Sequence, residues 1–219
     1  MTSLIKSILF LLIFFSCINS YSQEFPPDSI ILRKIFGTTD KGGKTYSCKY
    51  RGEQNFHSYH DNVVYKIVFK TKVNLNGNDL ILTILEAPYG TQHGHQLGYQ
   101  DFYFLKLAGD KVELVDSIKS NGIVPIGDVS EFEILDIGKN KKAIVSTFKS
   151  TGNSHFETKK IISLLELNKL TYLFSIHVEY DNSVWKIPES EDSDCEAERY
   201  TEKFEIINNN SEWFDIKIN

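Results

Sequence analysis

Four histidines in two close pairs have the clearest potential for chemistry in this sequence. His57 and His60 lie in FHSYHD, and His93 and His95 lie in TQHGHQLGYQD. Neutral imidazole is the most common metal ligand, and residues one position apart in an extended chain lie about 6 to 7 Å from each other on the same side of it. One interpretation is therefore a zinc site in a metal-dependent hydrolase, with these histidines as ligands and water at an open position.

The stretch around His93 and His95 also has the composition of a polar recognition loop. Residues 88–100 contain a proline and three glycines, which favour a long loop over a strand that would fix the geometry of metal ligands. Tyrosines among polar residues are typical of adaptable binding surfaces with aromatic anchors. We favour this second interpretation, which predicts that a ligand contacts Tyr89, His93, His95 and Tyr99 and that no cofactor is bound.

Other familiar catalytic motifs are absent from the sequence. No serine lies in a Gly-x-Ser-x-Gly turn, and no His-Glu-x-x-His segment occurs. Residues 37–45, GTTDKGGKT, approach a phosphate-binding loop, but Thr38 occupies the position of its first glycine, so we expect a flexible turn. The sequence favours a binding or interaction module over an enzyme. Its ligand stays open and could be a glycan, a peptide, an envelope protein or an enzyme to be inhibited.

The first 22 residues predict export. A lysine is followed by an apolar run at residues 8–15 and then by small and polar residues, which is the order of a bacterial-type secretory signal peptide. The run is shorter than the ~20 residues that span a bilayer. Small side chains favour cleavage before Gln23, which would leave residues 23–219 as the mature chain, without a transmembrane span, in the periplasm or outside the cell.

A second processing route involves Cys17. The segment FFSC resembles the lipobox of bacterial lipoproteins. This resemblance implies a structural envelope protein that lipid on Cys17 holds at the outer membrane. We favour soluble export and keep the lipoprotein as the alternative.

Charge restricts the class of partner. The full chain has a formal net charge of −5, whereas nucleic-acid binding relies on basic patches that displace counterions. A nucleic-acid partner is therefore not expected. The acidic segment at residues 189–198 is expected to be a solvated loop, and the sequence leaves the oligomeric state open.

The remaining sequence predicts an all-β, mostly antiparallel fold. Short runs rich in β-branched and aromatic residues, such as VVYKIVFK and DLILTIL, alternate with turn residues such as Asn76 and Gly77. At most one or two short helices are expected, the first with Asp28 as its N-cap and Gly37 at its end. No segment has the composition of a linker, so we expect residues 23–219 to form a single domain, arranged as a sandwich, a barrel or a partial propeller-like meander.

Two later segments carry local predictions. Residues 132–148, FEILDIGKNKKAIVSTF, resemble one blade hairpin of FG-GAP or integrin-type propellers, and this resemblance implies a β-hairpin but no ligand site because the calcium-binding aspartates are missing. His177, in FSIHVEY, alternates with apolar neighbours. We expect it on a strand face with a hydrogen-bond partner.

Two cysteines are left after removal of the signal peptide, Cys48 in YSCKY and Cys195 in SDCEAE. Exported proteins with two cysteines commonly pair them. The ends of a β-meander often lie on neighbouring strands, so a disulfide between Cys48 and Cys195 is predicted. The alternative is a buried Cys48 and a solvent-exposed Cys195.

The interpretation of the N-terminus gives a prediction for the intact mass. The exported protein should begin at Gln23, in its open or cyclised form, because the small side chains before this residue suit signal peptidase. A Cys17→Ser variant should then give the same mature mass. A diacylglyceryl-modified Cys17 at the N-terminus would contradict soluble export.

Overall fold

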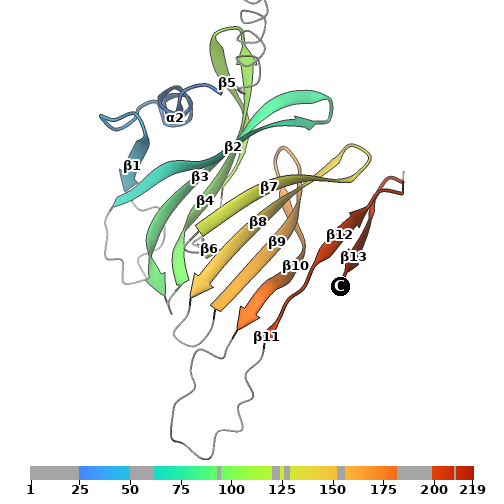
Figure 1. Cartoon of the computed structure of the whole chain (residues 1–219). Coiled ribbons are helices and arrows are strands. Elements are labelled where there is room, and N and C mark those ends of the chain that lie inside the picture. Colours follow the sequence, from blue (N-terminus) through green and yellow to red (C-terminus); the bar gives the residue numbers. More distant parts are fainter. Residues whose placement is uncertain are drawn as a thin grey trace, which may run out of the picture.

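The computed structural model describes residues 25–49, 62–92, 95–119, 124–125, 129–151, 156–181, 199–209 and 211–219. Within these ranges the protein has the predicted all-β, mostly antiparallel fold, and its two main sheets curl into a half-barrel (Figure 1). The sequence left open a sandwich, a barrel or a partial propeller-like meander, and the observed half-barrel is closest to the barrel.

Thirteen strands make up the described sheets. Within each main sheet the strands pair antiparallel in chain order, except that β6 pairs with β4. The first sheet contains β1 (Thr45–Lys49), β2 (Asn62–Leu75), β3 (Asn78–Gln92), β4 (His95–Ala108) and β5 (Lys111–Ile118), with β6 (Val124–Pro125) paired to β4. The second sheet contains β7 (Val129–Gly138), β8 (Lys141–Thr151), β9 (Phe156–Leu165), β10 (Leu170–Asp181) and β11 (Arg199–Tyr200). A separate hairpin consists of β12 (Phe204–Ile207) and β13 (Asp215–Ile218).

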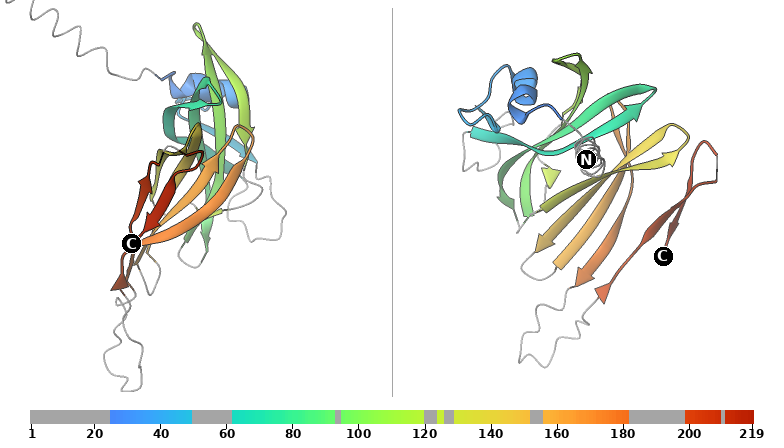
Figure 2. Two further views of the ribbon diagram at one scale, coloured as in Figure 1. Left: turned by 90° about the vertical axis from the view of Figure 1, so that its right-hand side faces the viewer. Right: turned by 45° about the horizontal axis from the view of Figure 1, so that its top comes forward.

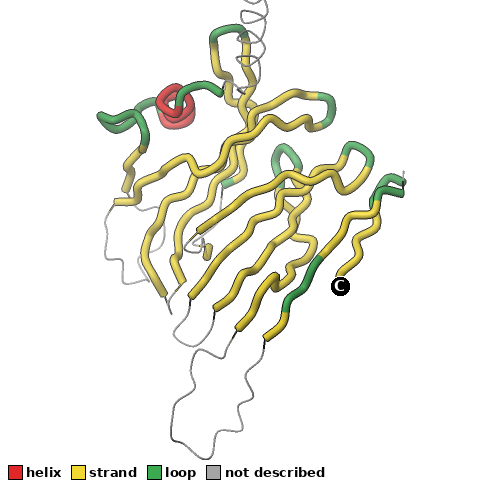
Figure 3. The backbone as a smooth tube through the Cα atoms, in the orientation of Figure 1, coloured by secondary structure: helices red, strands yellow, loops and turns green. Residues whose placement is uncertain are grey.

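Short turns connect the long strands (Figure 3). Between β2 and β3, Asn76 and Gly77 have φ values of 54° and 78°, and glycine and asparagine adopt such positive values at the least steric cost. Asn140, between β7 and β8, has a φ of 60°. The predicted hairpin turns are therefore confirmed, and the hairpin expected at residues 132–148 lies in β7 and β8.

The predicted helix is α2 (Asp28–Phe36). Gly37 ends it in the left-handed conformation, with a φ of 79°, and donates its N–H to the carbonyl of Arg33 at 2.8 Å. The prediction that Asp28 caps the helix is wrong. Pro27 occupies the N-cap position, and the carboxylate of Asp28 instead accepts a hydrogen bond from Lys70 Nζ of β2 at 2.6 Å.

The central part of the first sheet is buried on both faces. On one face, Leu82, Ile84 and Phe104 belong to a core that also contains Ile144 and Leu165 of the second sheet. On the other face, two smaller clusters pack the same sheet against α2, whose Ile31 and Leu32 are 0% exposed. The helix and the second sheet therefore cover opposite sides of the first sheet.

The expectation of a long loop at residues 88–100 is wrong. Strand β3 continues to Gln92 and β4 begins at His95, and these two residues pair with each other. The proline and glycines are accommodated because Pro88 lies opposite Gly98, which has no side chain to obstruct it, and because a register shift follows that pair. The segment is thus the outer end of a long hairpin.

The hairpin of β12 and β13 lies against the second sheet on the side away from the main core (Figure 2). Its Phe204 and Ile206 pack on a cluster that includes Val145 and Ile162. At the far end, Gly138 of β7 forms an isolated antiparallel bridge with Trp213. A Cβ atom at Gly138 would overlap the carbonyl oxygen of Glu212.

This close contact predicts that Gly138→Ala destabilises the protein by about 1 to 3 kcal/mol, because the added methyl group forces the C-terminal segment away from β7. Gly138 has no positive φ, so the effect would arise from this contact and not from the backbone conformation. Chemical denaturation measures the change. The matched control is Gly42→Ala, where an added Cβ meets nothing within 4 Å and the expected change is within about 0.5 kcal/mol. Equal destabilisation by the two substitutions would contradict the close contact between Gly138 and the C-terminal segment.

Candidate functional site

The hairpin of β3 and β4 carries the residues that the sequence nominated for binding. Tyr89 lies in β3, and His95 is the first residue of β4. His93 lies outside the described residues, as do His57 and His60 of the other histidine pair. The structure therefore places two of the predicted contact residues on adjacent strands at the outer end of one hairpin.

Tyr99 is part of the protein interior at the base of this hairpin. Its side chain is 7% exposed, and its ring stacks near that of Tyr65 with a centroid distance of 6.4 Å. Phe36 of α2 contacts Tyr65 and Tyr103 and stacks on Tyr46 at 4.0 Å. Tyr99 was predicted to contact a ligand from a loop, but it lies in β4, and strand pairing turns its ring toward the helix.

Two buried carboxylates lie beside the tyrosines. Gln100 Nε2 donates a hydrogen bond to Glu86 Oε1 at 3.0 Å, and the hydroxyl of Tyr103 donates one to Asp101 Oδ2 at 3.4 Å. Glu86 is 5% and Asp101 is 2% exposed. Buried carboxylates require such partners because desolvation otherwise disfavours their charge.

These two carboxylates point to opposite faces of the sheet. Glu86 lies directly opposite Gln100, and Asp101 lies opposite Leu85, so the alternation of side chains along a strand separates them. They cannot act together on one bound substrate as a catalytic acid and base. Glu86 was not among the residues nominated from the sequence, although a lone acid in the apolar run LILTILEA was a usable signal.

A β-bulge distinguishes the outer part of the hairpin. Pro88 pairs with Gly98, and Gly90 pairs with Leu97, so Tyr89 is the extra residue of β3. On the other edge of β4, β6 pairs with Leu97 and Gly98, which holds this part of β4 between two strands. Bulges are frequent next to functional sites because they bend a strand and redirect a side chain.

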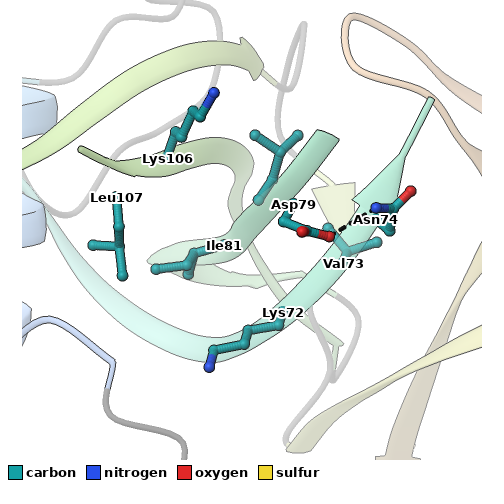
Figure 4. A pocket seen from close by; sticks show the side chains of 8 residues that line it. Lys72, Val73, Asn74, Asp79, Ile81, Lys106 and Leu107 are labelled. Carbon is teal, nitrogen blue, oxygen red and sulfur yellow. Dashed lines mark hydrogen bonds between the residues drawn. The ribbon is translucent and has the colours of Figure 1, made fainter. Parts of the chain in front are cut away.

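A second surface feature is a pocket of about 460 Å³ near the turn between β2 and β3 (Figure 4). Ile81 and Leu107 contribute apolar surface, and Asn74 Nδ2 donates to Asp79 Oδ1 at 2.7 Å on its polar side. Lys72 lies opposite Ile81 in the strand register and shares its face. The pocket therefore combines apolar surface with a cation on the side of the sheet that α2 covers.

His177 lies on β10, and the prediction that it has a hydrogen-bond partner on a strand is confirmed. Its Nε2 atom is 2.7 Å from Glu157 Oε1 of β9. The carboxylate of Glu202 accepts the backbone N–H of His177 at 2.9 Å, and the N–H of Glu202 donates to the His177 carbonyl at 3.0 Å. These contacts attach the C-terminal segment to the edge of the second sheet.

The metal and disulfide predictions fall mostly on positions outside the described ranges. Among the described residues, no group of three or more histidine, cysteine, aspartate or glutamate side chains is placed to hold a metal ion. Cys48 is half-buried in β1, whereas Cys195 and Cys17 lie outside the described residues. The zinc site at the histidine pairs and the Cys48–Cys195 disulfide stay predictions.

No family model, no curated protein and no solved structure matches this chain. In the part of the chain that the structure describes, no helix is long and apolar enough to cross a membrane.

The favoured interpretation of the histidines predicts that the purified protein contains no stoichiometric transition metal, because zinc ligands separated by a single residue are less common than the wider spacings of compact sites. Elemental analysis of the exported protein tests this. About one zinc per chain, lost on His93→Ala with His95→Ala, would instead support the metal-dependent hydrolase. The control is His155→Ala, which changes a histidine outside both pairs and should retain the zinc.

Proposed function

We propose that this protein is an exported binding module that contacts its ligand through the outer end of the β3–β4 hairpin. The observation that carries the proposal is the bulge at Tyr89, which interrupts an otherwise regular pairing at the point where the sequence is richest in tyrosine, histidine and glutamine. Export is supported by the signal-like order of the first 22 residues.

The base of the hairpin supports this role because it is rigidly packed. Tyr65, Tyr99 and Phe36 fill the space between the sheet and α2, and Glu86 and Gln100 are joined by a hydrogen bond on the opposite face. A binding surface on such a base loses little conformational freedom when the ligand binds. The packed base would thus support ligand contacts made farther out on the hairpin.

Binding without turnover fits the chemistry better than catalysis does. The buried carboxylates each accept a hydrogen bond from a neighbouring side chain and point to opposite faces. Tyrosine and histidine instead supply amphipathic contact area and adaptable hydrogen bonds. These properties suit an extracytoplasmic peptide, glycan or protein, including an enzyme that the module would inhibit.

The proposal predicts that Tyr89→Ala combined with His95→Ala weakens capture of a ligand from native envelope extract by at least about tenfold, as expected when an aromatic anchor is removed. Quantitative mass spectrometry of the material bound to immobilised protein measures the loss. Tyr172→Ala is the matched control, because Tyr172 is a 60% exposed tyrosine on β10 of the other sheet.

The two variants should also melt within a few degrees of the wild-type protein, so that a loss of capture reports on contact and not on folding. Equal capture by all three proteins, or equal loss with Tyr172→Ala, would contradict a binding site on the hairpin.

A further inference from the structure

Charge is divided unevenly along this chain. Residues 25–49 and 62–75, which form α2, β1 and β2, contain eight lysines and arginines and two acids, a net charge of +6. Residues 76–219 contain 14 basic and 24 acidic residues, a net charge of −10. The acidic total therefore conceals a basic N-terminal part, which Figure 1 places at one side of the molecule.

Most of the basic charge on the helix side of the first sheet is free to attract a partner. Five exposed cations there have no ion pair within the described ranges: Arg33, Lys34, Lys41, Lys44 and Lys72. The positions of Arg33 and Lys34 on α2 and of Lys41 and Lys44 in the turn that follows place them beside the helix. The strand register places Lys72 on the same face of the sheet, opposite Ile81, which packs with Ile31 of the helix.

Three carboxylates near these cations have partners of their own. Asp28 forms an ion pair with Lys70 at 2.6 Å. Asp40 accepts hydrogen bonds from the hydroxyls of Thr45 and Ser47, and Asp79 accepts one from Asn74. Asp40 and Asp79 keep their charge, because hydroxyl and amide donors do not neutralise a carboxylate. The five unpaired cations outnumber these two acids, so this surface is net positive.

Large apolar side chains lie among these cations. Ile30 of α2 is 45% exposed. Leu107 is 45% exposed and lies opposite Val112, and Leu114 is 40% exposed and lies opposite Leu105. Val112 and Leu105 both pack against the helix, so Leu107 and Leu114 share the helix side of the sheet. Exposed leucine and isoleucine between lysines form the pattern of a surface that enters the headgroup region of a bilayer.

We propose that this helix-side surface docks on an anionic lipid bilayer. Its cations would attract acidic headgroups, and the tips of Ile30, Leu107 and Leu114 would enter the interface. A lipid surface is favoured over an acidic protein because Ile30, Leu107 and Leu114 expose apolar tips on the same side as the cations, and a bilayer offers anionic headgroups above an apolar layer. This inference goes beyond the proposed ligand site, which lies at the outer end of the β3–β4 hairpin.

Vesicle co-sedimentation tests the proposal. The exported full chain is mixed with vesicles of phosphatidylcholine alone or with roughly one-third phosphatidylglycerol, an anionic lipid. We expect at least tenfold stronger partition to the anionic vesicles at about 0.1 M salt, and loss of that preference at about 0.5 M salt, where the Debye length is much shorter. All variants are compared as the same processed chain, so any contribution of the N-terminus cancels in the comparison.

Two charge-reversal variants locate the surface. Lys41→Glu, Lys44→Glu and Lys72→Glu together should abolish the preference, whereas Lys169→Glu, Lys203→Glu and Lys217→Glu, at exposed positions in the second half of the chain, should retain it at the same net charge. Glutamine at the first three positions should give an intermediate loss of the preference for anionic vesicles. This neutral variant distinguishes the removal of positive charge from misfolding of the glutamate variant. Equal partition to both vesicles, or equal loss in both triple variants, would overturn the proposal. Salt-sensitive self-association in place of vesicle binding would also overturn it, in favour of a second copy of the chain as partner.

Discussion

From Leu80 to Ala87, strand β3 exposes no more than 5% of any side chain, so both of its faces need a covering layer. A strand of an antiparallel sheet commonly leaves one face to solvent, and burial of both faces demands a continuous apolar run such as LILTIL. The second sheet covers the face with Leu82 and Ile84, and α2 covers the face with Ile81 and Leu85. The position of every other layer follows from this strand.

The second sheet then has an outer apolar face of its own. Ile137, Val145 and Ile162 would be left in water without the C-terminal hairpin, and at roughly 25 cal/mol per Å² this exposure would cost several kcal/mol. The hairpin is attached at both of its ends, by Glu202 beside His177 and by Trp213 beside Gly138. The half-barrel is thus stabilised by successive layers, each of which covers the apolar face of the layer before it.

The sequence was sufficient to predict strands, turns and the helix because these depend on neighbouring residues. Positive φ at Asn76 and the end of α2 at Gly37 are local properties that composition reveals. The interior position of Tyr99 and the pairing of His177 with Glu157 depend on strand register, which brings distant residues together. For the same reason, a proline and three glycines indicated a loop where partner strands hold an extended hairpin.

Helix α2 links the two surfaces that the structure offers to partners. Its inner side places Phe36 against Tyr65 and Tyr103 at the base of the β3–β4 hairpin, while its outer side exposes Arg33 and Lys34. A helix of nine residues has little stability of its own, so it is held by this packing and by the ion pair of Asp28 with Lys70. The same packing positions the cations on one side of the sheet and supports the tyrosines beneath the hairpin, so both surfaces depend on the contact between α2 and the first sheet.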